Sequence, residues 1–138
     1  MRPNVNTENP WVLRTDFSDQ LIWEQICTII QEPVDGFSAY VDFINDADYE
    51  GVIIDHLLTL VPKNYKYGFI MIVDQIAISN IDHPLLIVNL TESSNASFRA
   101  IPSTVQAIEN NLSIGNMDFE EFAHSVDESG IFRDFPEE

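Results

Sequence analysis

Three aspartates lie at or near the carboxyl ends of apolar segments that the sequence predicts to be strands: Asp16, Asp42 and Asp74. If these strands are parallel neighbours, their carboxyl ends share one edge of the sheet, where ligands bind in open α/β sheets. Converging carboxylates could hold Mg²⁺, which prefers oxygen ligands, or could divide into a general acid and a general base. Aspartate is also common where a strand passes into a loop, because it caps and turns the backbone. We therefore expect a local structural role first, and a metal or acid–base role as the alternative.

Two of the basic residues, Arg14 and Arg99, lie inside predicted strands of a chain that is poor in positive charge. Arg14 and Asp16 are two residues apart, so their side chains share one strand face. The favoured interpretation is a structural ion pair between Arg14 and Asp16, or between Arg99 and a nearby carboxylate. The alternative is an anchor for a small carboxylate or phosphate ligand. Together these residues form the candidate pocket: Arg14, Asp16, Asp42, Asp74 and Arg99.

The sequence offers no other arrangement that predicts catalysis. His56, His83 and His124 are scattered, and none has a second histidine or cysteine at metal-ligand spacing. The chain carries no glycine-rich phosphate loop and no nucleophile elbow. Cys27, the single cysteine, lies among isoleucines and is interpreted as a small buried hydrophobe. We assign no catalytic residue, no metal ligand and no cofactor.

The balance of charge restricts the class of partner. Among 138 residues, 23 are acidic and six are lysine or arginine, which gives a formal net charge of −17. This charge repels phosphate, so nucleic acid and anionic membrane are not expected as partners, whereas a basic protein would be steered toward the surface. The carboxylates of the candidate acidic binding face are Asp46, Asp48, Glu50, Glu120, Glu121, Asp127 and Glu128. No apolar run approaches the length of a membrane span, and the first residues resemble no secretory signal, so a cytoplasmic location is expected.

Apolar periodicity and turn residues predict the element order β-α-β-α-β-β-β-α-α. The predicted strands cover residues 12–16, 38–44, 67–74, 85–91 and 96–101. Predicted helices cover residues 18–31, capped by Asp16 or Ser18, and residues 54–61. Two further helices begin at the capping patterns Ser103–Gln106 and Asp118–Glu121. Residues 75–84 are predicted to be irregular, and residues 131–135 are apolar enough to dock on the core.

This order predicts an α/β fold, with an α+β tendency in the C-terminal half. Alternation at the start favours parallel strands, and the hairpin around residues 92–95 adds antiparallel ones. We expect a single domain over residues 11–135, built on a mixed sheet of about five strands with helices packed on its faces. Residues 1–10 are expected to form a flexible arm, and the tail at residues 136–138 is expected to be loose.

Several segments occur together in an order that resembles a known family: VLRTDFSDQLIWEQIC, HPLLIVNL, FRAIPSTVQAIENNLSIGNMDFEEFAHSV and GIFRDF. The chain is similar, over about residues 11–135, to an uncharacterised family of small acidic proteins known only as a domain of unknown function. The resemblance implies a standalone domain. It implies no activity, substrate or site residue.

Three hypotheses for function remain. The first is a protein-binding module of the inhibitor or immunity kind, which presents an acidic face to a basic partner. The second is a small-molecule or Mg²⁺-dependent enzyme that uses the strand-end carboxylates. The third is a structural or regulatory subunit that forms homo-oligomers through the edge of its hairpin or through exposed aromatic side chains. The charge, the size and the missing catalytic motifs favour the first.

Overall fold

The computed structural model describes residues 8–91 and 95–135, and these contain a six-stranded mixed sheet. The spatial order of the strands is β2-β1-β3-β4-β5-β6. Their bounds are β1 Trp11–Arg14, β2 Asp42–Ile44, β3 Phe69–Val73, β4 Leu85–Asn89, β5 Ser97–Ala100 and β6 Ile131–Phe132. β1 pairs in parallel with β2 and β3, the run β3-β4-β5 is antiparallel, and β6 is parallel to β5. The predicted mixed α/β sheet is confirmed, with β6 as an additional strand.

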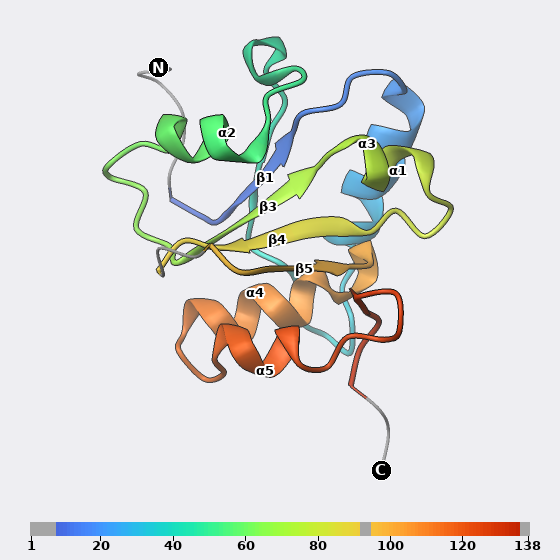
Figure 1. Ribbon diagram of the computed structural model, residues 1–138. Helices are drawn as coiled ribbons and strands as arrows, with labels where there is room; N and C mark the ends of the chain where they lie inside the picture. The colour runs from blue at the N-terminus through green and yellow to red at the C-terminus, as the bar shows by residue number, and fades with distance from the viewer. Residues whose placement is uncertain (1–7, 92–94, 136–138) are drawn as a thin grey trace.

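Helices cover both faces of this sheet. The described α-helices are α1 Gln20–Gln31, α2 Ile54–Leu60, α3 Gln75–Ser79, α4 Val105–Ser113 and α5 Phe119–Ala123, with short 3₁₀ turns η1 Ala47–Tyr49 and η2 Pro102–Thr104. Side chains of α1, α3, α4 and α5 pack on one face, and those of η1 and α2 pack on the other. Figure 1 shows α2 on one side of the sheet and α4 and α5 on the opposite side.

The two clearest apolar patterns of the sequence correspond to β3 and α1, which contribute many of the buried residues of the core. All five residues of β3 are buried, as expected for a central strand with helices on both faces. α1 buries Trp23, Ile26 and Ile30 along one stripe. Its N-cap is Asp19, whose Oδ1 accepts a hydrogen bond from the Ile22 amide at 3.1 Å. The expectation that Asp16 or Ser18 would cap this helix is therefore wrong by one to three residues.

Two further local predictions differ from the structure. Residues 75–79, expected to be irregular, form α3, because the carboxylate of Asp74 caps the Ala77 amide at 3.1 Å. The capping box expected at Ser103–Gln106 is not formed, because Pro102 starts η2 and the Thr104 hydroxyl donates to the Ile101 carbonyl at 2.7 Å. The box at Asp118–Glu121 is present at the start of α5.

Some predictions fall partly outside the described residues. These are the arm at residues 1–7, the tail at residues 136–138 and positions 92–94 of the hairpin loop. Asn9, at the end of the expected arm, donates two hydrogen bonds to the carboxylate of Asp42. Within the described ranges, no helix combines the length and the apolar character that crossing a bilayer requires.

Candidate functional site

The carboxyl ends of β2, β1 and β3 lie at one edge of the sheet, because the three strands are parallel neighbours. The chain passes from β1 to β2 through α1 on one face, and from β2 to β3 through α2 on the other face. From its carboxyl end β1 continues to β2 on one side, and β3 continues to β4 on the other side, so the strand order reverses between β1 and β3 and makes this place a topological switch point. Ligands of open α/β sheets bind at such points, so the candidate site is built from this edge.

Arg14 is buried at this edge and joins the loops that follow β1 and β2. Its Nε donates to the backbone oxygen of Asp16 at 3.0 Å, and its Nη1 donates to Gln20 Oε1 at 2.8 Å and to Asn45 Oδ1 at 3.2 Å. The guanidinium carbon lies 4.3 Å from the ring centre of Phe17. Within residues 8–91 and 95–135, Arg14 forms no ion pair, so the expected bridge to the Asp16 carboxylate is replaced by a bond to its backbone. Arg14 therefore fixes two loops rather than holding an exposed anion site.

Asp74 and Arg99 form the structural ion pair that was expected for Arg99. Arg99 Nη1 and Nη2 donate to the two oxygens of Asp74 at 3.0 and 2.7 Å. Arg99 Nη1 also donates to the Pro84 carbonyl at 2.9 Å. The bidentate pair connects β5 with the end of β3 and with the start of β4, and it leaves Asp74 engaged in local structure.

Asp42 lies at the opposite edge of the sheet from Asp16 and Asp74. The sequence suggested a strand over residues 38–44 with Asp42 late in it, but β2 begins at Asp42, which pairs with Trp11 at the start of β1. The expected convergence of the three aspartates is therefore not formed. In the part of the chain that the structure describes, no group of three His, Cys, Asp or Glu side chains is placed to hold a metal ion.

The seven carboxylates of the candidate acidic face do not share one surface. The first group, Asp46, Asp48 and Glu50, surrounds η1 on the α2 side of the sheet. The second group, Glu120, Glu121, Asp127 and Glu128, belongs to α5 and the segment after it, on the opposite side (Figure 1). In the second group, Glu121 closes the capping box of α5, and Asp127 pairs with Arg133 at 2.6 Å. The expectation of a single face is corrected because the sheet separates the two groups.

The first group instead continues across the carboxyl edge of the sheet. We define the acidic rim as the carboxylates on the two loops that follow β1 and β2: Asp16, Asp19, Asp46, Asp48 and Glu50. The two loops are joined directly, since the Gly51 amide donates to the Thr15 carbonyl at 2.8 Å. The buried side chain of Arg14 binds both loops, through the backbone oxygen of Asp16 and the side chain of Asn45. The rim is therefore one connected surface rather than two independent loops.

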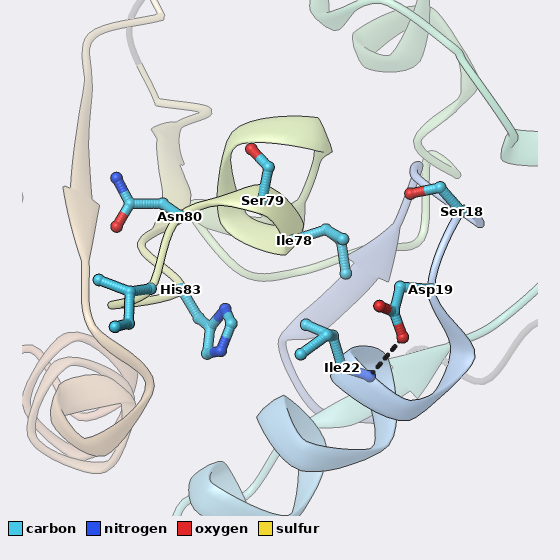
Figure 2. Close-up of a pocket in the computed structure, with 8 residues that line it drawn as sticks. Ser18, Asp19, Ile22, Ile78, Ser79, Asn80 and His83 are labelled. Atoms are coloured by element: carbon cyan, nitrogen blue, oxygen red, sulfur yellow. Dashed lines mark hydrogen bonds between the residues drawn. The ribbon is translucent and has the colours of Figure 1, made fainter.

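A pocket of about 560 Å³ opens beside the rim at the switch point itself, and we call it the switch-point pocket. Its lining comes from the start of α1 and from the segment that follows β3: Ser18, Asp19, Ile22, Ile78, Ser79, Asn80, Ile81 and His83. Figure 2 shows Asp19 on the α1 side and His83 on the other, with Ile22 and Ile78 between them. Its volume is within the usual range for small-ligand sites.

The loop between α3 and β4 is held in an unusual conformation next to this pocket. His83 has a φ of 50°, in the left-handed region, although Pro84 follows it and favours extended backbone at the preceding residue. The loop is held on both sides of His83: Arg133 pairs with Asp82 at 2.9 Å, and Arg99 binds the Pro84 carbonyl. Such strained positions persist where surrounding contacts impose them, and they are frequent at binding sites.

The shifted pKa values of three groups have structural causes. Burial raises the pKa of the Cys27 thiol to about 12, and Cys27 packs against the core as expected for a small hydrophobe. Burial also raises the pKa of Tyr65 above its usual range. The hydrogen bond from Arg133 lowers the pKa of Asp127. None of these three residues belongs to the rim or lines the switch-point pocket.

None of the eight residues that line the pocket belongs to the candidate pocket inferred from the sequence, and three of them show why: Asp19, Ile81 and His83. Asp19 was available as a cap, because it directly precedes the apolar stripe of α1. Ile81 is 90% exposed, and no periodic pattern distinguishes an exposed isoleucine from a buried one. His83 was interpreted as part of a turn, and its backbone conformation depends on contacts from distant elements.

Comparison with family models matches residues 9–135 to DUF6924, a domain of unknown function. The matched range includes every described strand of the sheet and every described helix on its two faces. Comparison with curated proteins gives no match. The resemblance inferred from the ordered segments of the sequence is therefore confirmed.

Proposed function

The chain belongs to the DUF6924 family, whose function is unknown, and we propose from the arrangement of its own residues that it is a protein-binding module. In this proposal it acts in the manner of an inhibitor or immunity protein and presents the acidic rim to a basic partner. The observation that carries the proposal is the gathering of rim carboxylates on two connected loops at the carboxyl edge of the sheet.

The positions of the basic residues support this proposal. Arg14 is buried, and Arg99 and Arg133 pair with carboxylates that do not belong to the rim. Lys63 and Lys66 lie in the segment before β3, at the amino edge of the sheet. The lysine and arginine side chains of the described residues are therefore buried, paired with carboxylates outside the rim or distant from it, and the acidic charge gathered on the two loops would attract a cationic surface.

The alternatives have less support. The enzyme hypothesis depended on three aspartates, of which Asp42 lies at the other edge and Asp74 is paired with Arg99. The oligomer hypothesis depended in part on the edge of the hairpin, but β6 pairs with β5 along Arg99 and Ala100. A steered, reversible association through the rim uses only features that the described residues present to solvent.

A charge-matched pair of variants tests the proposal. The rim variant carries Asp16→Asn, Asp46→Asn, Asp48→Asn and Glu50→Gln, changes that keep an acceptor oxygen at each position. The control variant carries Glu32→Gln, Asp35→Asn, Asp55→Asn and Glu128→Gln, which change the net charge equally at exposed sites elsewhere. Partners are captured from cells of the source organism at low salt, and the affinity of a captured basic protein is measured by calorimetry over a range of salt concentrations.

We expect the rim variant to bind at least about tenfold more weakly and with a smaller salt dependence, because rim charges set both quantities. The control variant is expected to bind within about threefold of the wild type, since its charges act only at long range through salt. The proposal is wrong if no basic protein binds the wild type at low salt, or if the two variants weaken binding equally.

A further inference from the structure

We propose that the switch-point pocket receives an arginine side chain of the basic partner. This inference rests on the proposed function and specifies the residue type that the partner inserts beside the acidic rim. Three properties of the pocket carry it: the hydrogen-bonding character of its polar atoms, its apolar walls, and the fixed conformation of its loop.

Two of the polar groups in the pocket are available as hydrogen-bond acceptors. His83 Nδ1 lies 2.9 Å from the Ala77 carbonyl, which can only accept, so Nδ1 donates there, and the tautomer with its single proton on Nδ1 presents Nε2 as an acceptor. One oxygen of Asp19 caps the Ile22 amide, and the other, Oδ2, makes no hydrogen bond within the described ranges. Both atoms accept hydrogen bonds and the carboxylate carries negative charge, so these two groups suit a cationic donor.

The apolar part of the pocket suits the stem of a long basic side chain. Ile22 and Ile78 lie between Asp19 and His83 (Figure 2). Ile81 also lines the pocket, and its side chain is 90% exposed. The exposed side chain of Ile81 can cover the methylene groups of an inserted side chain. Arginine fits better than lysine, because its planar fork has five donors that can reach acceptors on two walls at once.

The loop between α3 and β4 carries three of the eight lining residues and is held by contacts within the chain. Arg133 holds Asp82, Arg99 holds the carbonyl of Pro84, and Ala77 holds the ring of His83. A pocket whose walls are already fixed loses little conformational entropy on binding. It can therefore act as the central anchor of an interface, for which arginine is among the preferred residues.

The test uses a defined probe and needs no knowledge of the partner. The isotope-labelled full chain is titrated with the peptide acetyl-Gly-Arg-Gly-amide and followed by NMR. The same peptide with citrulline is the control ligand, because citrulline keeps the shape of arginine without its charge. The variant Asp19→Asn keeps the N-cap of α1, since asparagine caps as well as aspartate does. Glu128→Gln is the matched control, because it removes the same charge at an exposed site on α5's side of the sheet.

We expect the arginine peptide to shift the amide signals of residues 18–22 and 78–83 in preference to the rest of the chain. Asp19→Asn is expected to weaken binding about tenfold, Ile81→Ser about threefold, and Glu128→Gln by less than about twofold. The citrulline peptide is expected to bind at least about tenfold more weakly. The inference is overturned if shifts spread evenly over the acidic surface, or if Asp19→Asn and Glu128→Gln have equal effects.

The two proposals can fail separately. If a captured basic partner loses affinity with the rim variant but binds the Asp19→Asn and Ile81→Ser variants as tightly as the wild type, the pocket inference is wrong and the proposed function stands. If the arginine peptide binds the pocket but the rim variant leaves partner affinity unchanged, the pocket is supported and the rim proposal is wrong.

Discussion

At the scale of single residues, the hydroxyl of Tyr65 connects the amino ends of two central strands. It accepts a hydrogen bond from the Trp11 amide at 3.0 Å and donates one to the Phe69 carbonyl at 2.7 Å. Tyr65 is buried, so both bonds form away from water. A single phenol oxygen therefore helps to align β1 with β3, the two strands that flank the switch point.

We predict that Tyr65→Phe lowers the free energy of unfolding by roughly 1–3 kcal/mol, because it takes a buried partner from two backbone groups. Urea denaturation measures the change. Tyr40→Phe is the matched control: Tyr40 is 64% exposed, and its substitution is expected to stay within about 0.5 kcal/mol of the wild type. Equal effects of the two substitutions would mean that the Tyr65 hydroxyl bonds add nothing to stability.

The candidate site was only partly predictable at this scale. The spacing of Arg14 and Asp16 indicated a contact on one strand face, but it could not distinguish the carboxylate from the backbone oxygen that Arg14 actually binds. Asp42 was assigned to the wrong edge, because its position depends on where β2 begins. Strand ends are set by pairing with neighbours, which the pattern of a single segment does not contain.

At the scale of elements, β6 is a two-residue strand held by aromatic packing as well as backbone pairing. Phe132 is fully buried, and its ring centre lies 5.3 Å from that of Phe122 and 5.0 Å from that of Phe135. It also meets Phe98 of β5 edge-on at 6.5 Å. These rings join α5, β5 and β6 into one aromatic cluster on the face of the sheet that α4 and α5 cover.

We predict that Phe132→Ala lowers the free energy of unfolding by about 3–5 kcal/mol, because it leaves a cavity inside this cluster. Phe37→Ala is the control, since Phe37 is 61% exposed and its loss is expected to cost at most about 0.5 kcal/mol. Urea denaturation of both variants distinguishes the two positions. A cost for Phe132→Ala close to that of the control would show that β6 does not depend on its aromatic anchor.

Elements with a repeated period or a capping pattern were predicted, whereas α3 and β6 were not. The stripe of α1 and the apolar run of β3 each carry enough residues to identify type and burial. α3 has five residues, little more than one helical turn, and β6 has two, so neither repeats its period. Both short elements are held by groups that lie far away in the sequence. Arg99 pairs with Asp74, the N-cap of α3, and the aromatic cluster packs around Phe132 of β6.

At the scale of the whole molecule, the protein is expected to lose stability in alkaline solution. Burial raises the pKa of Cys27 from 9.0 to about 12, and burial also raises the pKa of Tyr65. Above pH 9.0 the unfolded chain loses a proton at Cys27 that the folded chain keeps. The unfolded state then binds fewer protons than the native state, so the free energy of unfolding falls as pH rises.

Urea denaturation at a series of pH values up to about pH 11 measures this dependence. We expect a decline that begins near pH 9.0 through Cys27 and becomes steeper above pH 10.0, where Tyr65 ionises in the unfolded chain. In Cys27→Ala the decline should begin only near pH 10.0, the usual pKa of the tyrosine that remains. An unchanged onset in this variant would contradict the assignment to the thiol.

The placement of the first strand inside the sheet has a consequence for the order in which the chain can fold. β3, β4 and β5 pair with their immediate successors, so residues 69–100 can form an antiparallel meander from local contacts. β1 can pair with β2 as soon as β2 is made, but its other edge stays open until β3 follows, where Arg14 pairs with Val73. During synthesis, the β1–β2 pair therefore keeps one open edge until the later β3 pairs with β1, and this contact joins the N-terminal half to the antiparallel meander.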